Sequence, residues 1–257
     1  NKGKDISYAG CGLPYYVGGV IQQREELVVN TPEAFMALTG AEVRTGVEAT
    51  ALDRTAKQVT AVELSTGESR VYPYDKLVIA VGASPVVPAC DGLELENVFY
   101  MRTPDDADAL RKKVDEGAIR RAVVVGGGLV GCETALHYAK LGKKVTVMEM
   151  QSELAPDAST TGRNELMTEI AAEPNFIPLT GARCISLTAT SVTYEKDGKQ
   201  ETITADSVVL SAGMKAKTQE ADSFIGTALA FAEIGDCVRA RTVEYATKEA
   251  YYAAVNL

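Results

Sequence analysis

The clearest pattern in the chain is a continuous apolar run followed by apolar residues at helical spacing. The run Ala122–Val125 is typical of a strand that is buried on both faces in a parallel sheet. From Leu129 to Ala139, apolar residues recur at the spacing of one helix face, and Gly142 is placed to end that helix. A second apolar strand, Val145–Met148, follows. The pattern therefore predicts a strand-helix-strand unit of an α/β fold.

Two longer stretches share a second design. The first, residues 51–84, contains alternating strands around the turn Thr66-Gly67. An apolar strand, Leu77–Val81, follows and ends at Gly82. We interpret this order as a small antiparallel meander that leads into a buried strand.

The second stretch, residues 185–215, repeats this order. It contains the strand Ser191–Tyr194, a hairpin turn at Asp197-Gly198, and the strand Val208–Leu210, which ends at Gly213. We interpret the two stretches as duplicated nucleotide-binding units. The repeat thus predicts two Rossmann-like lobes, each carrying an antiparallel meander.

Polar turn residues indicate where the chain crosses between the two lobes. Arg102–Asp106 is a polar turn in which Pro104 is placed to open a helix, and we expect the return crossing near Met214–Thr218. The prediction is one domain of residues 103–216 inserted into another made of residues 1–102 and 217–257.

The two units differ in one respect. The second unit begins with a Gly-rich turn at Gly126 and ends at Gly213, which corresponds to Gly82 in the first unit. If the first unit had the same length, its Gly-rich turn would lie before Asn1. We therefore expect the first unit to lack its own Gly-rich turn and the chain to be truncated at its N-terminus.

The turn Gly126–Gly131 has the spacing of a dinucleotide-binding site. In the pattern Gly126-x-Gly128-x-x-Gly131, the first glycine suits a sharp turn, the second a close backbone approach to a pyrophosphate, and the third tight packing of helix on sheet. The N-terminus of the following helix attracts the anion. Glu149, at the end of the next strand, lies at the sequence distance at which a carboxylate accepts hydrogen bonds from the adenine ribose hydroxyls. Because Glu149 would repel a 2′-phosphate, we predict NADH in preference to NADPH.

Composition and charge exclude several classes of function. The net charge is -9 and the longest basic run is Arg111–Lys113, so we expect no nucleic-acid partner. There is no apolar run of about 18 residues and no apolar stretch of a signal peptide at the start, so we expect a cytoplasmic protein without a membrane partner. The five cysteines form no CxxC pair and no ligand-spaced cluster. This spacing argues against a metal site and against a disulfide framework, and it leaves open a single reactive thiol.

A second candidate site lies near the C-terminus. Phe231–Cys237 predicts a short strand that ends in Gly235-Asp236, and Val243–Asn256 predicts a helix. An Asp at such a strand end suits the hydroxyls of a ribityl chain, and the helix N-terminus suits a phosphate. Because Gly-Asp by itself is a common turn, a flavin site here depends on the context of the whole chain.

That context is a family resemblance, and it spans nearly the whole chain. Ser7–Gly19 resembles the active-site segment of the single-cysteine flavoprotein disulfide reductases, Tyr74–Pro85 resembles their strand approaching the flavin, and Ile234–Asp236 resembles their second flavin motif. The family includes coenzyme A-disulfide reductases, persulfide reductases, NADH oxidases and NADH peroxidases. The stretch Leu13–Tyr16 is most similar to the coenzyme A-disulfide and persulfide reductase branch, in which Asn often stands where this chain has Gly10.

The resemblance implies a glutathione-reductase-type fold in which an NAD(H) domain of residues 103–216 is inserted into an FAD domain of residues 1–102 and 217–257. It implies FAD and NADH as cofactors. Cys11 is then the catalytic thiol, through which electrons pass from NADH and FAD to a disulfide or persulfide such as coenzyme A disulfide. The expected cofactor-binding residues are Ser7, Ala80, Gly82, Gly126, Gly128, Leu129, Val130, Gly131, Glu133, Glu149, Gly213, Gly235 and Asp236. The resemblance also implies a homodimer in the full-length parent.

Three alternatives remain open from the sequence. One is oxygen or peroxide reduction of the NADH oxidase and peroxidase type. Family members of that type use a histidine from the first flavin turn, whereas the lone His137 of this chain is expected to be structural or solvent-facing. The segment Asp206–Lys215, followed by Ile234–Asp236, also resembles multi-domain ene-reductases, in which this chain would be an NADH-to-flavin electron-input module. The third, non-enzymatic alternative is a nucleotide-binding remnant or sensor.

Overall fold

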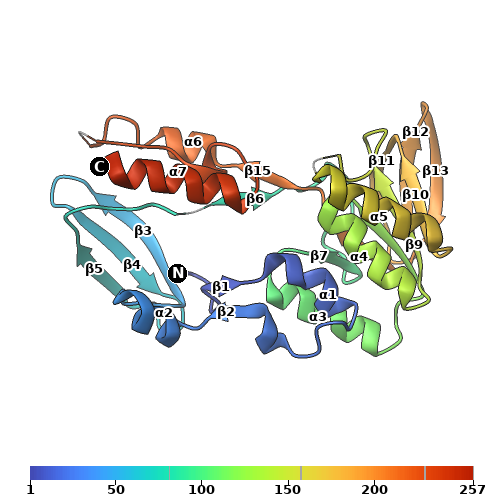
Figure 1. The fold of residues 1–257 in the computed structure, drawn as a ribbon, viewed down its shortest axis with the longest axis horizontal. Coiled ribbons are helices and arrows are strands. Elements are labelled where there is room, and N and C mark those ends of the chain that lie inside the picture. Colours follow the sequence, from blue (N-terminus) through green and yellow to red (C-terminus); the bar gives the residue numbers. More distant parts are fainter. Residues whose placement is uncertain (81, 157, 229, 257) are drawn as a thin grey trace. The chain divides into compact units, whose positions relative to one another are not determined.

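The apolar run predicted as a buried strand forms the middle of a five-stranded parallel sheet in the computed structural model, and Figure 1 labels the strands β7, β9 and β10 of this sheet. The strand order is β10-β9-β8-β14-β7. The strands are β7 (Val98–Tyr100), β8 (Arg121–Val125), β9 (Lys144–Glu149), β10 (Phe176–Thr180) and β14 (Ser207–Leu210). The predicted strands Ala122–Val125, Val145–Met148 and Val208–Leu210 are therefore confirmed.

The structure describes residues 1–80, 82–156, 158–228 and 230–256, and the chain divides into two compact units. One unit contains Asn1–Tyr8, Val28–Ser84 and Met214–Leu257, and the other contains Ala9–Leu27 and Pro85–Gly213. Residues 9–27 and 85–102, which the sequence analysis placed in the outer domain, are thus grouped with the parallel sheet. The assignment of a cofactor to each domain stays a prediction.

Helices cover one face of the parallel sheet. They are α1 (Leu13–Val17), α3 (Pro104–Asp115), α4 (Leu129–Lys140) and α5 (Thr160–Ala172), accompanied by the 3-10 turns η1 (Gly10–Gly12) and η2 (Arg24–Leu27). Val124, Val147 and Val209 of the sheet are fully buried in this layer. Helix α3 begins as predicted, because Thr103 and Asp106 form a capping box in which each side chain accepts a hydrogen bond from the other's backbone N–H.

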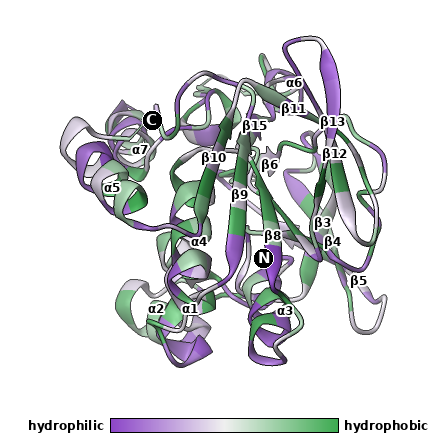
Figure 2. Ribbon diagram, turned by 90° about the vertical axis from the view of Figure 1, so that its right-hand side faces the viewer, coloured by the Kyte–Doolittle hydropathy of each residue, from purple (hydrophilic) through white to green (hydrophobic). Residues whose placement is uncertain are grey.

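The other face of the sheet packs against an antiparallel meander. Its strands are β11 (Ala182–Leu187), β12 (Ser191–Lys196) and β13 (Lys199–Thr204). The predicted Asp197-Gly198 hairpin turn is confirmed, with φ angles of 52° and 72°. Val123 and Val208 face this layer and pack in the same cluster as Val192. Alternate residues of the strands thus face two buried layers, and in Figure 2 the hydrophobic colour follows β10 and much of β9.

The other unit contains a second antiparallel meander. Its strands are β3 (Val47–Asp53), β4 (Gln58–Glu63) and β5 (Ser69–Pro73), and the turn predicted at Thr66-Gly67 joins the last two. The predicted helix Val243–Asn256 is confirmed as α7. The remaining short elements are β1 (Ser7–Tyr8), β2 (Val28–Asn30), β6 (Ala83–Pro85), β15 (Met214–Ala216), α2 (Pro32–Thr39), α6 (Thr218–Asp222) and the 3-10 turn η3 (Gly235–Cys237).

Two predicted strands are wrong. Of the segment Leu77–Val81, residues 77–80 form no strand, and Val81 lies outside the described residues. Val78 is 86% exposed. Residues 231–234 are also irregular, and Gly235 opens the turn η3. An apolar run predicts burial, but a strand also needs a neighbour for its N–H and C=O groups. Among the described residues, neither segment has such a neighbour in a sheet.

Candidate functional site

The three glycines of the predicted dinucleotide turn are held by different constraints. Gly126 has a φ of 111°, and a Cβ there would lie 2.3 Å from the Ser211 carbonyl oxygen at the end of β14. A Cβ on Gly131, the third residue of α4, would lie 2.0 Å from the carbonyl oxygen of Gly126. Gly128 has an ordinary φ of −68°, and a Cβ there meets nothing within 4 Å. The first and third glycines are therefore required by packing, whereas the second leaves open space above an exposed backbone.

The beginning of α4 is suited to an anion. Gly128 is its N-cap residue and offers no side-chain oxygen to the first N–H groups. Leu129 and Val130 follow at the surface, 44% and 39% exposed. A helix start with uncapped N–H groups attracts a phosphate. Beside the turn, the Ser211 hydroxyl is buried without a hydrogen-bond partner among the described residues. The residues present therefore fit the pyrophosphate of a dinucleotide.

Glu149 ends β9 directly beside the turn. Its Oε2 accepts a hydrogen bond from the Gly127 N–H at 2.6 Å, and its Oε1 accepts one from the Gln151 N–H at 2.8 Å. The carboxylate is half-buried, and each of its oxygens has further lone pairs for a ligand. Gly213 follows β14 at the same edge of the sheet with a φ of 91°. Thus Glu149 and Gly213 lie at the strand ends where an open α/β sheet binds its ligand.

Cys11 is exposed on η1, and the short helix α1 behind it is anchored to α3. The Tyr16 hydroxyl donates to Asp108 Oδ1 at 2.7 Å. The Arg111 guanidinium stacks over the Tyr16 ring at 4.9 Å and donates to the backbone oxygens of Tyr16 and Ile21. The thiol is therefore presented from a segment whose backbone is held by side chains distant in the sequence.

A second contact joins α1 to α4. The Tyr15 ring meets the His137 ring edge-on, with centroids 4.6 Å apart. Burial, with a smaller contribution from the Lys140 ammonium, lowers the pKa of His137, so that this ring is neutral at pH 7. The Glu133 carboxylate, followed by burial, raises the pKa of Tyr15, and burial raises the pKa of Glu133 itself. His137 thus packs against the thiol segment, and Glu133 lies near the same segment.

Gly18 permits the close packing of α1 on α4. A Cβ at this position would lie 2.6 Å from His137 Cβ and 2.7 Å from its Cγ. We expect Gly18→Ala to lower the free energy of unfolding by about 1–3 kcal/mol, because the atoms in the way are tied to the backbone of α4. Chemical denaturation measures the change. Gly10→Ala is the matched control, since a Cβ there meets nothing within 4 Å. Equal midpoints for the two variants would show that this contact is loose.

The residues predicted for a flavin lie in the other unit. Asp236 Oδ1 accepts a hydrogen bond from the Arg241 N–H at 3.2 Å, and the Gly235 N–H donates to Glu249 Oε2 at 2.7 Å. Glu233 Oε1 and Arg241 Nε are buried without a hydrogen-bond partner among the described residues. Ser7 is half-buried on β1, Ala80 is exposed, and Gly82 is half-buried with a φ of 61°. The polar atoms without partners beside Asp236 fit a polar ligand such as a ribityl chain.

Several residues of these sites were not predicted as site residues from the sequence. Tyr15, Gly18 and Arg111 shape the thiol segment, and Ser211 and Glu249 contact the two glycine motifs. One sequence signal was available for Tyr15, which lies one helical turn after Cys11. The others depend on contacts between distant parts of the chain.

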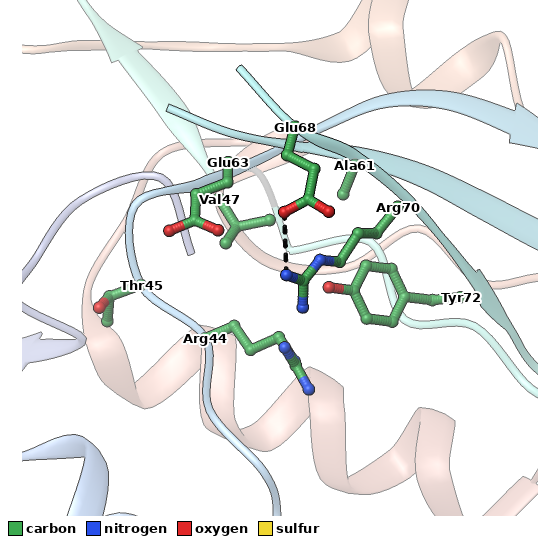
Figure 3. A pocket seen from close by; sticks show the side chains of 8 residues that line it. All are labelled: Arg44, Thr45, Val47, Ala61, Glu63, Glu68, Arg70 and Tyr72. Carbon is green, nitrogen blue, oxygen red and sulfur yellow. Dashed lines mark hydrogen bonds and ion pairs between the residues drawn. The ribbon is translucent and has the colours of Figure 1, made fainter. Parts of the chain in front are cut away.

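A separate hollow of about 180 Å³ lies on the meander β3-β4-β5 (Figure 3). Arg70 Nη2 pairs there with Glu68 Oε2 at 3.0 Å, and the Arg44 guanidinium lies 5.5 Å from the centre of the Tyr72 ring. Arg44 also pairs with Glu42. Because its cations are already partnered, this hollow is not the candidate site.

Neither a membrane-spanning helix nor a cluster of metal ligands is found among the described residues. None of their helices is both long and apolar enough to cross a membrane. In the same ranges, no three His, Cys, Asp or Glu side chains gather as a set of metal ligands.

Comparisons with known proteins give one family match and several named relatives. The family model described as pyridine nucleotide-disulphide oxidoreductase matches residues 1–249. An NADH oxidase of Methanocaldococcus jannaschii is 31% identical over 60% of this chain and 34% of its own length. A coenzyme A disulfide reductase of Staphylococcus haemolyticus is 31% identical over 57% of this chain and 33% of its own. The chain spans about a third of the length of these curated relatives.

A solved structure extends the match to most of the fold. The NAD-dependent persulfide reductase from A. fulgidus superimposes with a TM-score of 0.75 and 31% identity, covering 87% of this chain and 42% of that chain. The α/β fold with Rossmann-like lobes is thereby confirmed.

Proposed function

This chain belongs to the pyridine nucleotide-disulphide oxidoreductase family, and from that premise we propose that it carries electrons from NADH through FAD to a disulfide or persulfide at Cys11. The observation that carries the proposal is the grouping of an exposed thiol with a dinucleotide turn. Cys11 and Gly126–Gly131 belong to one compact unit, in which α1 packs against α4. The site for NADH and the thiol that reacts with the disulfide thus belong to the same compact unit.

The dinucleotide end is assigned to groups at the edge of the parallel sheet. The uncapped N–H groups of α4 and the open face of Gly128 bind the pyrophosphate. Glu149 accepts hydrogen bonds from the adenine ribose hydroxyls. FAD, when bound, supplies the acceptor for a hydride and the means to pass two electrons to sulfur. Gly235 and Asp236 bind its polar chain, together with Ser7, Ala80 and Gly82.

The thiol end follows from exchange chemistry. The Cys11 thiolate attacks one sulfur of the disulfide, forms a mixed disulfide with it and releases the other sulfur as a thiolate. Two electrons then cleave the mixed disulfide, restore the Cys11 thiolate and release the second thiolate. Cys132, the thiol beside the dinucleotide turn, is a poorer candidate: burial foremost raises its pKa to about 12, which keeps it protonated. Tyr15, whose pKa is raised, retains its proton near Cys11 at neutral pH.

We propose that the protein acts as a homodimer, as the family resemblance implies, and in the cytoplasm. The support for the compartment is chemical: the five cysteines are free in the structure, and a reducing compartment keeps thiols in that form. Coenzyme A disulfide is the acceptor favoured by similarity to the Staphylococcus haemolyticus enzyme. NADH oxidase chemistry is the second candidate, favoured by the Methanocaldococcus jannaschii relative.

A visible spectrum of the FAD-loaded protein tests the proposal. We expect a flavin band with a long-wavelength shoulder from the thiolate, because a thiolate beside an oxidised flavin donates charge into it. Alkylating Cys11 should remove the shoulder, and NADH should bleach the flavin before and after alkylation. A flavin that NADH bleaches without any shoulder, at any pH, would favour an electron-input module. A protein that cannot be loaded with FAD would favour a nucleotide-binding remnant or sensor.

The choice of nicotinamide nucleotide is tested at Glu149. Wild-type protein should prefer NADH, and Glu149→Gln should raise the ratio of kcat/KM for NADPH over NADH about tenfold, equivalent to about 1.4 kcal/mol. The reason is that Gln keeps a hydrogen-bond acceptor but removes the charge that repels a 2′-phosphate. Glu153→Gln is the matched control, because its exposed carboxylate pairs with Arg163 instead. A wild-type preference for NADPH would contradict the prediction.

A further inference from the structure

Two cysteines outside the candidate site lie close to each other. The thiols of Cys90 and Cys184 influence each other's pKa, and both side chains pack in the hydrophobic cluster between the sheet and the meander β11-β12-β13. The Cys132 thiol donates to the Gly127 carbonyl oxygen at 3.3 Å, and the Cys237 thiol donates to the Ile234 carbonyl oxygen at 3.0 Å. Cys11 is exposed. Cys90 and Cys184 are therefore set apart from the other thiols by lying close to one another.

The backbone holds the two positions together. Asp91 forms an isolated parallel bridge with Ser186 of β11. The Asp91 N–H donates to the Ile185 carbonyl oxygen at 3.2 Å, and the Leu187 N–H donates to the Asp91 carbonyl oxygen at 2.8 Å. Next to this bridge, a Cβ on Gly92 would lie 2.4 Å from the Leu187 carbonyl oxygen, so the two backbones are in direct contact. The residues on either side of the bridge are thereby kept in register.

An irregularity in β11 brings the side chains to the same place. In its pairing with β12, Cys184 lies opposite Tyr194 and Ser186 lies opposite Thr193, so that Ile185 is an extra residue. Such a bulge breaks the alternation of a strand and re-aims a side chain. In a regular strand, Cys184 and Ser186 would point to the same face, because side chains alternate along a strand. Cys184 would then lie on the face of Asp91, the partner of Ser186, and not on the opposite face, where Cys90 lies. The bulge accounts for the meeting of the two thiols.

We propose that Cys90 and Cys184 are a dithiol that closes to an intramolecular disulfide when the protein meets a low-molecular-weight disulfide. One protein thiolate attacks the small disulfide, forms a mixed disulfide and releases one small thiolate. The second protein thiolate then attacks the mixed disulfide and releases the other. The protein loses two protons and two electrons, and the small disulfide becomes two thiols.

Exposure decides the order of the two steps. Cys90 is partly exposed and Cys184 is buried, 5% exposed, so that Cys90 meets the small disulfide and Cys184 resolves it. Burial foremost raises the pKa of both thiols, that of Cys184 to about 12, and the Asp91 carboxylate adds to the rise at Cys90. Because thiolates are the attacking species, closure should be slow at neutral pH and faster as the pH rises. The disulfide would link the segment before β7 to the meander β11-β12-β13, and its formation would not require Cys11.

Mass spectrometry of the Cys11→Ser protein tests the proposal without interference from the exposed thiol. The protein is incubated with glutathione disulfide at mildly alkaline pH, unfolded in denaturant, alkylated, and digested. We expect two of the four thiols to be protected from alkylation and one cross-linked peptide to join Cys90 to Cys184. Adding Cys184→Ser should give instead a single glutathione adduct at Cys90, because the resolving thiol is gone.

Two results would overturn the proposal. One is full alkylation of all four thiols once the oxidised sample is unfolded. The other is a set of cross-links in which Cys132 or Cys237 takes part as often as Cys184 does. Thermal unfolding supplies an independent measure, since a cross-link between distant residues restricts the unfolded chain. Oxidation should raise the Tm of the Cys11→Ser protein by several degrees and leave the Tm of the Cys11→Ser, Cys184→Ser protein unchanged.

Discussion

Alanine in place of Gly131 is expected to abolish nucleotide binding by disrupting the turn itself. The added Cβ would lie 2.0 Å from the carbonyl oxygen of Gly126, a backbone atom that cannot move without opening the turn. Gly126 in turn is packed against Ser211 at the end of β14. We expect the free energy of unfolding to fall by about 3 kcal/mol or more, which is the upper end of the range for substitutions that overpack a core. Chemical denaturation and NADH titration together measure the effect.

Gly128→Ala is the matched control for that prediction. Its Cβ meets nothing within 4 Å, and its φ of −68° suits any residue, so the variant should keep the wild-type free energy of unfolding. It should nevertheless raise the KM for NADH about tenfold, because the methyl group would occupy the space assigned to the pyrophosphate. Unchanged NADH binding in this stable variant would contradict the proposed site, whereas unchanged stability of Gly131→Ala would contradict the packing.

Serine in place of Cys11 is expected to lower the turnover of a small disulfide by more than about 1,000-fold. The hydroxyl has nearly the shape of the thiol, but it is not ionised at neutral pH and cannot form a mixed disulfide. Because the side chain is exposed, the fold should be unaffected. Reduction of an artificial electron acceptor by NADH should remain within about twofold of wild type, since that reaction needs no thiol. Steady-state assays of the two reactions, run side by side, give the comparison.

Cys90→Ser is the control for a general effect of losing a thiol. In fully reduced protein it should retain the turnover of the disulfide, because Cys90 is partly buried and distant in sequence from the segment that carries Cys11. Retained disulfide turnover in Cys11→Ser would remove Cys11 from the mechanism and favour the electron-input alternative. Loss of both activities in Cys11→Ser would indicate damage to the scaffold, which near-UV circular dichroism would detect.

Local patterns in the sequence were sufficient for the dinucleotide turn and the elements around it. The spacing of Gly126, Gly128 and Gly131 between a strand and a helix depends only on residues close in the chain, and the hairpin at Asp197-Gly198 is set by the backbone angles that its own residues allow. Local patterns failed at residues 77–80 and 231–234. Apolar residues there predict burial, but the hydrogen-bond partner that makes a strand must come from elsewhere in the chain.

By itself, therefore, the sequence determined the α/β class and the position of the turn, because each is a matter of spacing and residue type, whereas the candidate thiol was identified by the family resemblance of the segment around Cys11. Only the tertiary structure decided what those features touch. It grouped the thiol segment with the parallel sheet, packed Gly18 against His137 of α4, and set Cys90 beside Cys184. These contacts join residues far apart in the chain, and they follow from how strands and helices pack, which no local spacing specifies.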